Sequence, residues 1–524
     1  MARRLDYPDI PFHALLQRAA KRWPDREAII FGDRRISFAE WDRLASRCAN
    51  GLLELGIRKG DRVALFMPNC PEYEITFFGC ARIGAVPVPL NPSYREREVC
   101  QTVDDAGAVA MVVAAPLQSV VEAARAEMPS LHHVIVVGDT MDEETQSFLG
   151  LMTRASETLP AVPVEDGDLA ALPYSSGTTG GPKGVMLTQR NLVCNAIQFV
   201  DCTQTTESDV LLIFLPLSHI YGVALMATAV AGGAKQMLME RFDLAEVIRL
   251  IRAEGVTEFY VAPPVMLALL NAPDLSPGDL KSARFIMSAA APLAADVARR
   301  VADRFDVPVI QAYGMTETSP LTHMVPLDRW GDLIGTVGVV APDTECRIVD
   351  IETGLRELPP GEVGEVTVHG PQVMAGYWNP PADTAAVLQN GWIRTGDIGR
   401  VDEDGNLSIV DRKKEMIKYR AFSIAPAELE AVLLEHPAVA DCGVTAQPDE
   451  EAGEVPRAYV VLRAGQHASP QELQAYVAER VAGYKQIRHV EMVDAIPRTP
   501  SGKILRRVLK ERAGAQGAPT PTGG

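Results

Sequence analysis

The sequence predicts an α/β protein with a large N-terminal domain of layered α/β subdomains, a small β-barrel-like subdomain and a small α+β C-terminal domain. With 524 residues, the chain is too long for one hydrophobic core. Short β-branched runs alternate with helical patterns over most of its length, which is typical of parallel sheets covered by helices. A turn-rich segment follows, and then about a hundred residues of alternating helices and strands, enough for a small domain.

The first strands are expected in RVALFM, VAMVVAA and HVIVVG, and later strands in VTEFYVAPP, ARFIMSAA and VPVIQAYG. Parallel sheets bind ligands beyond the carboxyl ends of their strands, and three of the motifs below lie at such ends. The most apolar stretch, residues 211–234, is interrupted by Pro216, His219 and Gly222. These interruptions favour a buried strand, a turn and a buried helix over a membrane span.

After Asp343 the pattern changes to hairpins, with Asp404 and Gly405 as a strong turn signal between two apolar runs. A domain boundary is expected near residues 412–415, where the hairpin pattern ends. This gives an N-terminal domain over residues 1–411, a junction at 412–414 and a C-terminal domain over 415–512. The last residues, 513–524, contain no apolar anchor and are expected to be disordered.

The composition narrows the class of protein. A net charge of −18 argues against a general nucleic-acid or anionic-membrane surface, although a local basic pocket for phosphates remains compatible with it. The eight cysteines form no CxxC pair and no zinc-type cluster, which favours reduced thiols in a cytoplasmic protein. The N-terminal segment MARRLDYPDIPFHALL lacks the apolar core of a secretory signal.

A glycine-rich segment, YSSGTTGGPKG, covers residues 174–184. Its backbone amides, its hydroxyls and Lys183 could hold an anion between a strand end and a helix that begins at Thr188. It is not a Walker A loop, because Pro182 stands where the second glycine belongs and Gly184 follows the lysine. The alternative is a surface loop whose glycines serve turns only.

QAYGMTETSP follows a predicted strand and places Tyr313, Thr316 and Glu317 on a turn at its end. Tyr313 could stack on a base, Thr316 could bond a phosphate oxygen, and Glu317 could hold Mg²⁺ among phosphates. A hairpin turn with a solvated glutamate is the alternative.

Two further motifs carry charged side chains on predicted turns. GWIRTGDIG places Asp397 in a tight turn between Gly396 and Gly399, where it could accept both hydroxyls of a ribose or form an Asx-turn. IPRTPSGKILRRVLKER places Lys503 in a turn before a basic helix, which suits a mobile arm as well as a solvated basic tail.

These motifs, together with DRKKEMIKYRAFSIAPAELE, occur in the order and at roughly the intervals of the adenylate-forming superfamily that includes acyl-CoA synthetases. The resemblance extends from about Phe12 to Arg512. Within that superfamily PSGKILRR, MTETSP and APAELE are most similar to fatty-acyl and 4-coumarate CoA ligases.

The resemblance implies a two-step reaction with ATP, Mg²⁺ and coenzyme A. A carboxylate attacks the α-phosphate of MgATP to give acyl-AMP and pyrophosphate, and the CoA thiolate then displaces AMP. Cations and oriented donors stabilise the charge that develops on the phosphate. The implied roles are a β/γ-phosphate loop for Ser175, Ser176, Gly177, Thr178, Thr179 and Lys183, catalysis for Lys503, an α-phosphate contact for Thr316, a magnesium ligand for Glu317, adenine stacking for Tyr313, and ribose contacts for Asp397 and Arg412.

The second step, by the same resemblance, uses a rotation of a mobile C-terminal domain about residues 412–414, with Lys414 as the hinge. Lys418, Arg420 and Ala421 then match the segment that contacts the pantetheine arm. Ala421 replaces a glycine that most relatives carry, so the channel must tolerate a methyl group. His219 matches a wall of the pocket near the carboxylate, against the alternative of a satisfied core histidine.

Ala289 and Ala312 also replace common glycines, at the border of the acyl pocket. Two added methyl groups should narrow that pocket, which favours a slim aliphatic fatty acid over a bulky aromatic acid. The expected partners are therefore a small carboxylic acid, ATP and CoA, without nucleic acid or a membrane span, and a homodimer is compatible with this. Two alternatives are a ligase that loads a carrier-protein pantetheine and a non-catalytic acyl- or nucleotide-binding protein. Luciferase-like oxygenation could occur only in addition to ligation.

Overall fold

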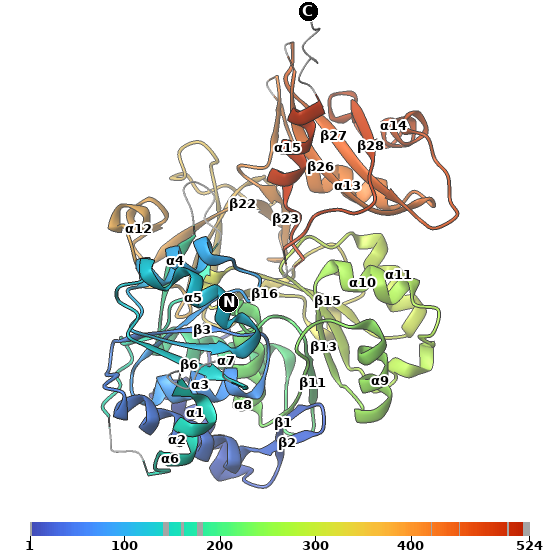
Figure 1. Cartoon of the computed structure of the whole chain (residues 1–524). Helices are drawn as coiled ribbons and strands as arrows, with labels where there is room; N and C mark the ends of the chain where they lie inside the picture. Colours follow the sequence, from blue (N-terminus) through green and yellow to red (C-terminus); the bar gives the residue numbers. More distant parts are fainter. Residues whose placement is uncertain are drawn as a thin grey trace, which may run out of the picture.

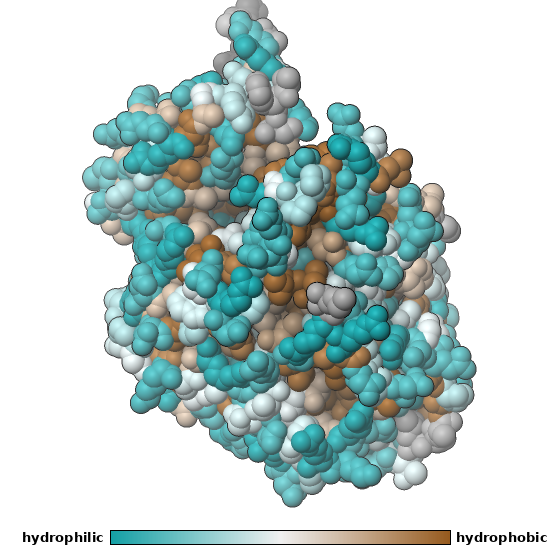
Figure 2. Space-filling model, turned by 180° about the vertical axis from the view of Figure 1, so that it is seen from behind, coloured by the Kyte–Doolittle hydropathy of each residue, from teal (hydrophilic) through white to brown (hydrophobic). Residues whose placement is uncertain are grey.

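The computed structural model describes residues 3–139, 146–158, 162–175, 182–420, 422–449, 451–499 and 502–516. The chain forms a large N-terminal domain and a small C-terminal domain that lies on top of it (Figure 1). Seen from behind, the small domain is a separate lobe joined to the large domain at a constriction, and polar side chains predominate on that face (Figure 2). The predicted α/β architecture is confirmed.

The central sheet of the large domain is parallel over most of its width. Its strands follow the order β17 (Val339–Val340), β16 (Leu321–Met324), β15 (Val309–Gly314), β14 (Phe285–Ser288), β13 (Glu258–Val261), β11 (Val210–Ile213), β12 (Lys235–Leu238), β1 (Glu27–Phe31) and β2 (Arg34–Ser37). β15 and β16 pair antiparallel, so the chain reverses direction after β15. This reversal creates the turn that carries MTETSP, with Thr316 and Glu317 as predicted. Tyr313 lies inside β15 and pairs with His323 of β16, so the prediction that it lies on the turn is wrong.

A second parallel sheet lies beside the first. Its order is β4 (Val86–Pro89), β3 (Arg62–Phe66), β5 (Ala110–Ala114), β6 (His133–Val137) and β7 (Gln146–Ser147). The six named runs form β3, β5, β6, β13, β14 and β15. The sequence analysis did not name β1, β2, β4, β7, β12, β16 and β17. Smaller antiparallel pairings connect β20 (Gly376–Tyr377), β10 (Lys183–Thr188), β8 (Leu169–Ala171) and β9 (Tyr174–Ser175).

Helices cover the faces of these sheets (Figure 1), and most residues of α3, α7 and α8 are buried. Contacts join α7 to α8, α1 to α2 and α8, and α2 to α3. Outside these lie α4, α5, α6, α9, α10 and α11. The bounds are α1 His13–Arg22, α2 Phe38–Glu54, α3 Pro71–Arg82, α4 Glu96–Ala106, α5 Gln118–Ala124, α6 Phe148–Arg154, α7 Gln189–Thr203, α8 Ile220–Gly232, α9 Leu244–Glu254, α10 Pro263–Asn271 and α11 Ala295–Phe305.

Local sequence signals explain where these helices begin and what they bury. The Ser37 and Thr188 side chains accept hydrogen bonds from the amides three residues on, which caps α2 and α7. The apolar stretch 211–234 contains β11, a turn and α8, as predicted, and α8 is buried almost throughout. Among the described residues, none of the helices is both long and apolar enough to cross a membrane.

An antiparallel sheet follows the central one, as the hairpin signals predicted. It contains β18 (Glu345–Val349), β19 (Gly364–His369), β22 (Trp392–Val401), β21 (Leu388–Gln389) and β23 (Leu407–Arg412), with α12 (Pro381–Val387) beside it. Asp404 and Gly405 form the turn between β22 and β23, where Gly405 has a φ of +85°. β23 ends at Arg412, directly before the small domain.

The small domain has its own sheet and its own core. The sheet contains β25 (Phe422–Ile424), β24 (Ile417–Tyr419), β27 (Gly453–Leu462), β26 (Val439–Asp449) and β28 (His489–Met492), and the helices are α13 (Pro426–Leu434), α14 (Pro470–Ala478) and α15 (Arg506–Gln516). Its buried apolar cluster includes Leu429, Val444 and Val460 and is separate from that of the large domain. α15 extends through Gln516 and so includes the first four residues of the segment expected to be disordered, while 517–524 lie outside the described residues.

Candidate active site

Glu317 lies buried in the turn η4 (Thr316–Thr318) between β15 and β16. Its Oε1 accepts hydrogen bonds from the hydroxyls of Tyr377, at 2.8 Å, and Ser175, at 3.2 Å. Among the described residues Oε2 accepts no hydrogen bond. A carboxylate with one free hard oxygen suits Mg²⁺, which binds one or two carboxylates and otherwise takes water and phosphate oxygens. The donor set thus fits a magnesium ion bound together with ATP.

Tyr377 was not among the residues that the sequence analysis selected. It lies on β20, which pairs with β10 beside the glycine-rich segment. The charge of Glu317 and burial both raise the pKa of the Tyr377 hydroxyl, with burial the larger cause, so this group stays a hydrogen-bond donor. The only signal in the sequence was the aromatic pair in AGYWN, and aromatic pairs are equally typical of packing.

Asp397, Tyr313 and Arg412 form a polar network in which Asp397 is buried and the other two residues are half-buried. The Tyr313 hydroxyl donates to Asp397 Oδ2 at 2.6 Å, and Arg412 Nε lies 3.0 Å from Asp397 Oδ1. Burial and the Asp397 carboxylate raise the pKa of Tyr313 well above its ordinary value. Asp397 chiefly raises the pKa of Arg412 as well. The three proposed nucleotide contacts are therefore brought together in one cluster.

The prediction that Asp397 sits in a tight turn is wrong. The residue lies inside the continuous strand β22, directly opposite Arg412 of β23. Gly396 has a φ of +70°, and the pairing register shifts between Ile398 and Gly399. A glycine in the left-handed conformation and a β-bulge change the direction of a side chain without ending the strand. Gly396 and Gly399 are also the residues from which the turn was predicted.

Lys183 begins β10, where its ammonium lies 2.7 Å from Asp383 Oδ2 and 5.2 Å above the ring of Tyr377. Asp383 on α12 is a second residue that the sequence analysis did not select. Ser175 contacts Glu317 and thus joins the same cluster. The remaining members of the predicted phosphate loop, namely Ser176, Gly177, Thr178 and Thr179, lie outside the described residues.

Lys503 reaches this cluster from the small domain. Its turn is closed by hydrogen bonds from the Gly502 amide to the Thr499 carbonyl and from the Thr499 amide to the Lys503 carbonyl, both 2.8 Å. The turn packs closely on α10 of the large domain, since a methyl group on Gly502 would come within 2.8 Å of Ala262 Cβ and 3.3 Å of Pro264 Cδ. The beginning of α10 is therefore the surface of the large domain on which the Lys503 turn packs.

Burial and four charged neighbours shift the pKa of the Lys503 ammonium. Burial and the Arg412 guanidinium lower the pKa of its ammonium. The carboxylates of Asp397 and Glu317 act in the opposite direction. Lys503 is thus within electrostatic reach of the proposed ribose contacts and of the proposed magnesium ligand. Its ammonium makes no hydrogen bond to the described residues.

His219 lies at the beginning of α8, where its Nδ1 accepts a hydrogen bond from the Tyr221 amide at 3.2 Å. Burial lowers the pKa of His219 to about 3, and the charge of Lys503 acts in the same direction. The ring is therefore neutral near pH 7, with its proton on Nε2. Thr316 lies next to Glu317, and its hydroxyl makes no hydrogen bond to the described residues, which leaves it available to a ligand.

The two alanines that the sequence analysis assigned to the acyl pocket lie on or directly after the neighbouring strands β14 and β15. Ala289 follows β14 and is half-buried, whereas Ala312 on β15 is buried. The buried hydroxyls of Ser288, which precedes Ala289, and of Tyr221 on α8 have no hydrogen-bond partner in the described part of the chain. Such groups are rare and indicate an unseen partner such as water or ligand.

The predicted CoA-channel residues lie on the β24–β25 hairpin of the small domain. Lys418 and Arg420 are exposed there, and Arg420 has a φ of +51° with its amide bonded to the Ala452 carbonyl at 2.7 Å. Ala421 is outside the described residues. Lys414 is exposed at the junction of the two domains.

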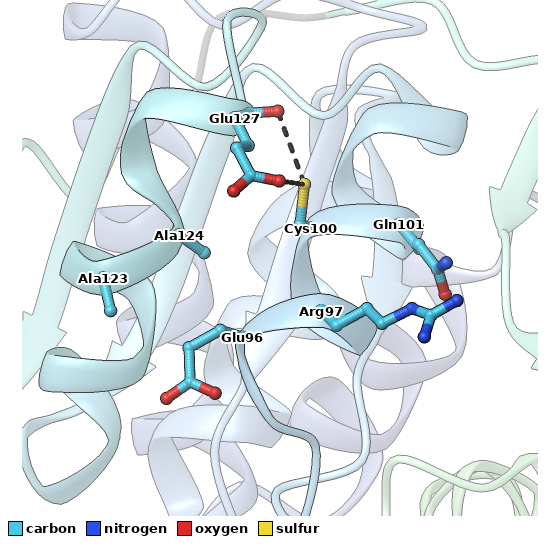
Figure 3. A pocket seen from close by; sticks show the side chains of 7 residues that line it. All are labelled: Glu96, Arg97, Cys100, Gln101, Ala123, Ala124 and Glu127. Atoms are coloured by element: carbon cyan, nitrogen blue, oxygen red, sulfur yellow. Dashed lines mark hydrogen bonds between the residues drawn. The ribbon is translucent and has the colours of Figure 1, made fainter.

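A separate depression of about 520 Å³ lies between α4 and α5 and contains none of the predicted site residues (Figure 3). Cys100 Sγ donates to the Glu127 carbonyl at 3.4 Å, and burial raises the pKa of this thiol. The described residues contain no cluster of three or more His, Cys, Asp or Glu side chains that could hold a metal by themselves. A magnesium ion at Glu317 would accordingly depend on the phosphates of ATP.

Comparisons with known proteins identify the family of the chain. The model of the AMP-binding enzyme family matches residues 16–378, and that of the AMP-binding enzyme C-terminal domain matches 428–503. The chain is 39% identical to a 4-coumarate–CoA ligase of Pinus taeda over 97% of this chain and 96% of that protein. It is 37% identical to 4-coumarate–CoA ligase 1 of Solanum tuberosum, over 97% and 94%.

Solved structures of CoA ligases share the whole fold. The anthranilate CoA ligase AuaEII in complex with anthranoyl-AMP matches with a TM-score of 0.91 and 28% identity, covering 98% of this chain and 99% of that one. ATP-bound MatB from Rhodopseudomonas palustris matches with a TM-score of 0.88 and 30% identity, covering 96% and 99%. The predicted resemblance is confirmed: the chain belongs to the AMP-binding enzyme family, and it is an adenylate-forming acid–thiol ligase.

Proposed function

We propose that this chain activates a carboxylic acid with MgATP to acyl-AMP and pyrophosphate, and then transfers the acyl group to CoA. The observation that carries the proposal is the position of Lys503: its turn packs on α10 of the large domain and brings the ammonium within electrostatic reach of Arg412, Asp397 and Glu317. A carboxylate that approaches the α-phosphate meets strong repulsion, because both groups are anionic. The Lys503 ammonium offsets this repulsion and stabilises the charge that develops in the transition state.

The other residues take roles that fit their surroundings. Asp397 and Arg412 would bind the ribose, and Tyr313 would cover the adenine. Lys183 and the hydroxyl of Ser175 would hold the departing pyrophosphate. Glu317 would hold Mg²⁺, which supplies charge neutralisation on the phosphates when bound. Thr316 would donate to the α-phosphate. His219, neutral and with its proton on Nε2, would border the carboxylate.

For the acid, our first candidate is a slim aliphatic chain. Ala289 and Ala312 support it, since methyl groups at these positions take space that glycine would leave open. An aromatic acid is the second candidate, because the relatives named above are 4-coumarate and anthranilate CoA ligases.

For the acceptor, CoA is the first candidate. Lys418 and Arg420 are exposed cations on the hairpin that would face the pantetheine arm after rotation of the small domain. A carrier-protein pantetheine is the alternative. We also propose a cytoplasmic location, which is supported by the free state of all eight cysteines.

A panel of straight-chain and aromatic acids, assayed with MgATP in the presence and absence of CoA, tests the proposal. Pyrophosphate release and a CoA thioester are expected, and hexanoate should exceed 4-coumarate in kcat/KM. A clear preference for 4-coumarate would reject the aliphatic acid. Pyrophosphate release without thioester would favour the carrier ligase, and no release with any acid would favour a binding protein.

A further inference from the structure

The helix α13 of the small domain begins without a cap of its own. Its N-cap residue is Ala425, whose side chain has no oxygen to offer to the first-turn amides. By contrast, α9 and α14 begin at Asp243 and Ser469, whose side chains accept from the amides three residues on. The first amides of a helix need such an acceptor, because they have no partner within the helix.

The missing acceptor comes from the large domain. Asp411 lies on β23, paired with Ile398 of β22, and only 4% of its surface is exposed. Its Oδ2 accepts the Ala427 amide of α13 at 2.9 Å, while its Oδ1 accepts the Arg412 amide at 2.6 Å. The negative charge also suits the positive end of the helix dipole. We call the bond between Asp411 and Ala427 the inter-domain cap.

The proposed hinge lies between the two partners of this bond. On one side, the Lys413 amide donates to the Gly396 carbonyl at 2.9 Å and its ammonium to the Ile351 carbonyl at 2.6 Å, so Lys413 is tied to the large domain. On the other side, Glu415 pairs with Arg506 of α15 at 3.4 Å. A rotation about the exposed Lys414 would leave Asp411 in place and carry Ala427 away.

We infer that Asp411 is a positioning residue for the first half-reaction. Its carboxylate caps α13 only in the orientation in which the small domain presents Lys503 to the nucleotide. The inter-domain cap therefore favours the adenylate-forming orientation, and it must break before the acyl transfer. This inference rests on the proposed function, since it assumes that the two half-reactions need different orientations of the small domain.

Another hydrogen bond between the domains provides a matched control. Arg463 Nη1 donates to Asn271 Oδ1 of α10 at 2.9 Å, at an exposed position. Exposed pairs stabilise little, whereas the bond from the part-buried Ala427 amide ends on a buried carboxylate, and its loss leaves that amide without an acceptor. Asn271→Ala is therefore expected to leave both half-reactions within about twofold of wild type.

The experiment compares Asp411→Ala with the wild type in the two half-reactions separately. Pyrophosphate release is measured with MgATP and the acid of the panel that the wild type uses best. Thioester formation is measured from the corresponding synthetic acyl-AMP and CoA. Adenylation should fall about fivefold, as expected for the loss of one cap, and thioester formation should be unchanged or faster. ATP binding, measured by calorimetry, should be unchanged, because Arg412 and Asp397 remain.

A second variant separates positioning from simple helix stability. Ala425→Ser in the Asp411→Ala background gives α13 a cap from within the small domain. It should restore the melting temperature without restoring adenylation. An equal loss in both half-reactions, no loss in adenylation, or restored adenylation in this double variant would overturn the inference. If the wild type forms no adenylate with any acid, the proposed function fails instead, and the wild-type control shows which of the two has failed.

Discussion

The two halves of the candidate active site are held in different ways. In the large domain, Asp397, Tyr313, Arg412 and Glu317 are fixed by short hydrogen bonds and an ion pair before any ligand arrives. In the small domain, Lys503 is positioned by the shape of its turn and by close packing on α10, and its ammonium makes no hydrogen bond to the described residues. A nucleotide site of this kind can remain intact while the lysine is withdrawn. Such a fixed nucleotide site with a separately positioned lysine suits an enzyme that carries out two successive reactions at one site.

The largest effect is expected at Lys503. Lys503→Ala should lower the adenylation rate by about a hundredfold or more, since it removes the charge that stabilises the transition state. ATP affinity should change little, because the groups of the large domain remain tied to one another. Stopped-flow pyrophosphate release and calorimetric ATP titration measure the two quantities. Lys510→Ala, an exposed lysine on α15, is the matched control. Full adenylation by Lys503→Ala would exclude the lysine from the mechanism.

The next largest effect is expected at Asp397, and it concerns the affinity for ATP instead of the adenylation rate. Asp397→Asn removes a charged acceptor shared by Tyr313 and Arg412, and it should weaken ATP binding by about tenfold. Adenylation at saturating ATP should fall less than in Lys503→Ala. Asp402→Asn, in the exposed turn between β22 and β23, serves as control. An unchanged ATP affinity would show that the network around Asp397 has a purely structural role.

A smaller effect is expected at Tyr377, which structure alone identified. Tyr377→Phe removes one of the two hydrogen bonds on Glu317 Oε1, and adenylation should fall about fivefold. Titration of Mg²⁺ in the pyrophosphate assay measures whether the metal dependence changes with it. Tyr476→Phe, on α14 in the small domain, is a conservative control. If both variants match the wild type, the bond between Tyr377 and Glu317 has no part in catalysis.

The pH dependence gives the smallest expected change. In the proposed mechanism, adenylation needs the protonated ammonium of Lys503, and burial together with Arg412 lowers its pKa. The rate should therefore decline on the alkaline side at a lower pH than an ordinary lysine would give. In Lys503→Arg this decline should move to higher pH, because arginine stays protonated. The pH profile of pyrophosphate release measures the shift, and identical alkaline limbs in both proteins would assign the decline to another group.

The sequence by itself determined the architecture and the chemical types of the site. Periodicity and turn signals are local properties, so the strands, the helix beginning at Thr188 and the hairpin at Asp404 and Gly405 could be predicted from neighbouring residues. The ordered motifs likewise indicated the family, which both the family models and the relatives confirm. The assignment of each site residue to its role stays a prediction.

Only the tertiary structure decided which of these residues meet and what else joins them. Tyr377 and Asp383 reach Glu317 and Lys183 through the pairing of β10 with β20, strands that are almost two hundred residues apart in the chain. Asp397 lies in a strand because pairing with β23 outweighs the local preference of its glycines for a turn. The cap of α13 by Asp411 also depends on how the two domains are placed. Such contacts follow from long-range packing, which no short stretch of sequence encodes.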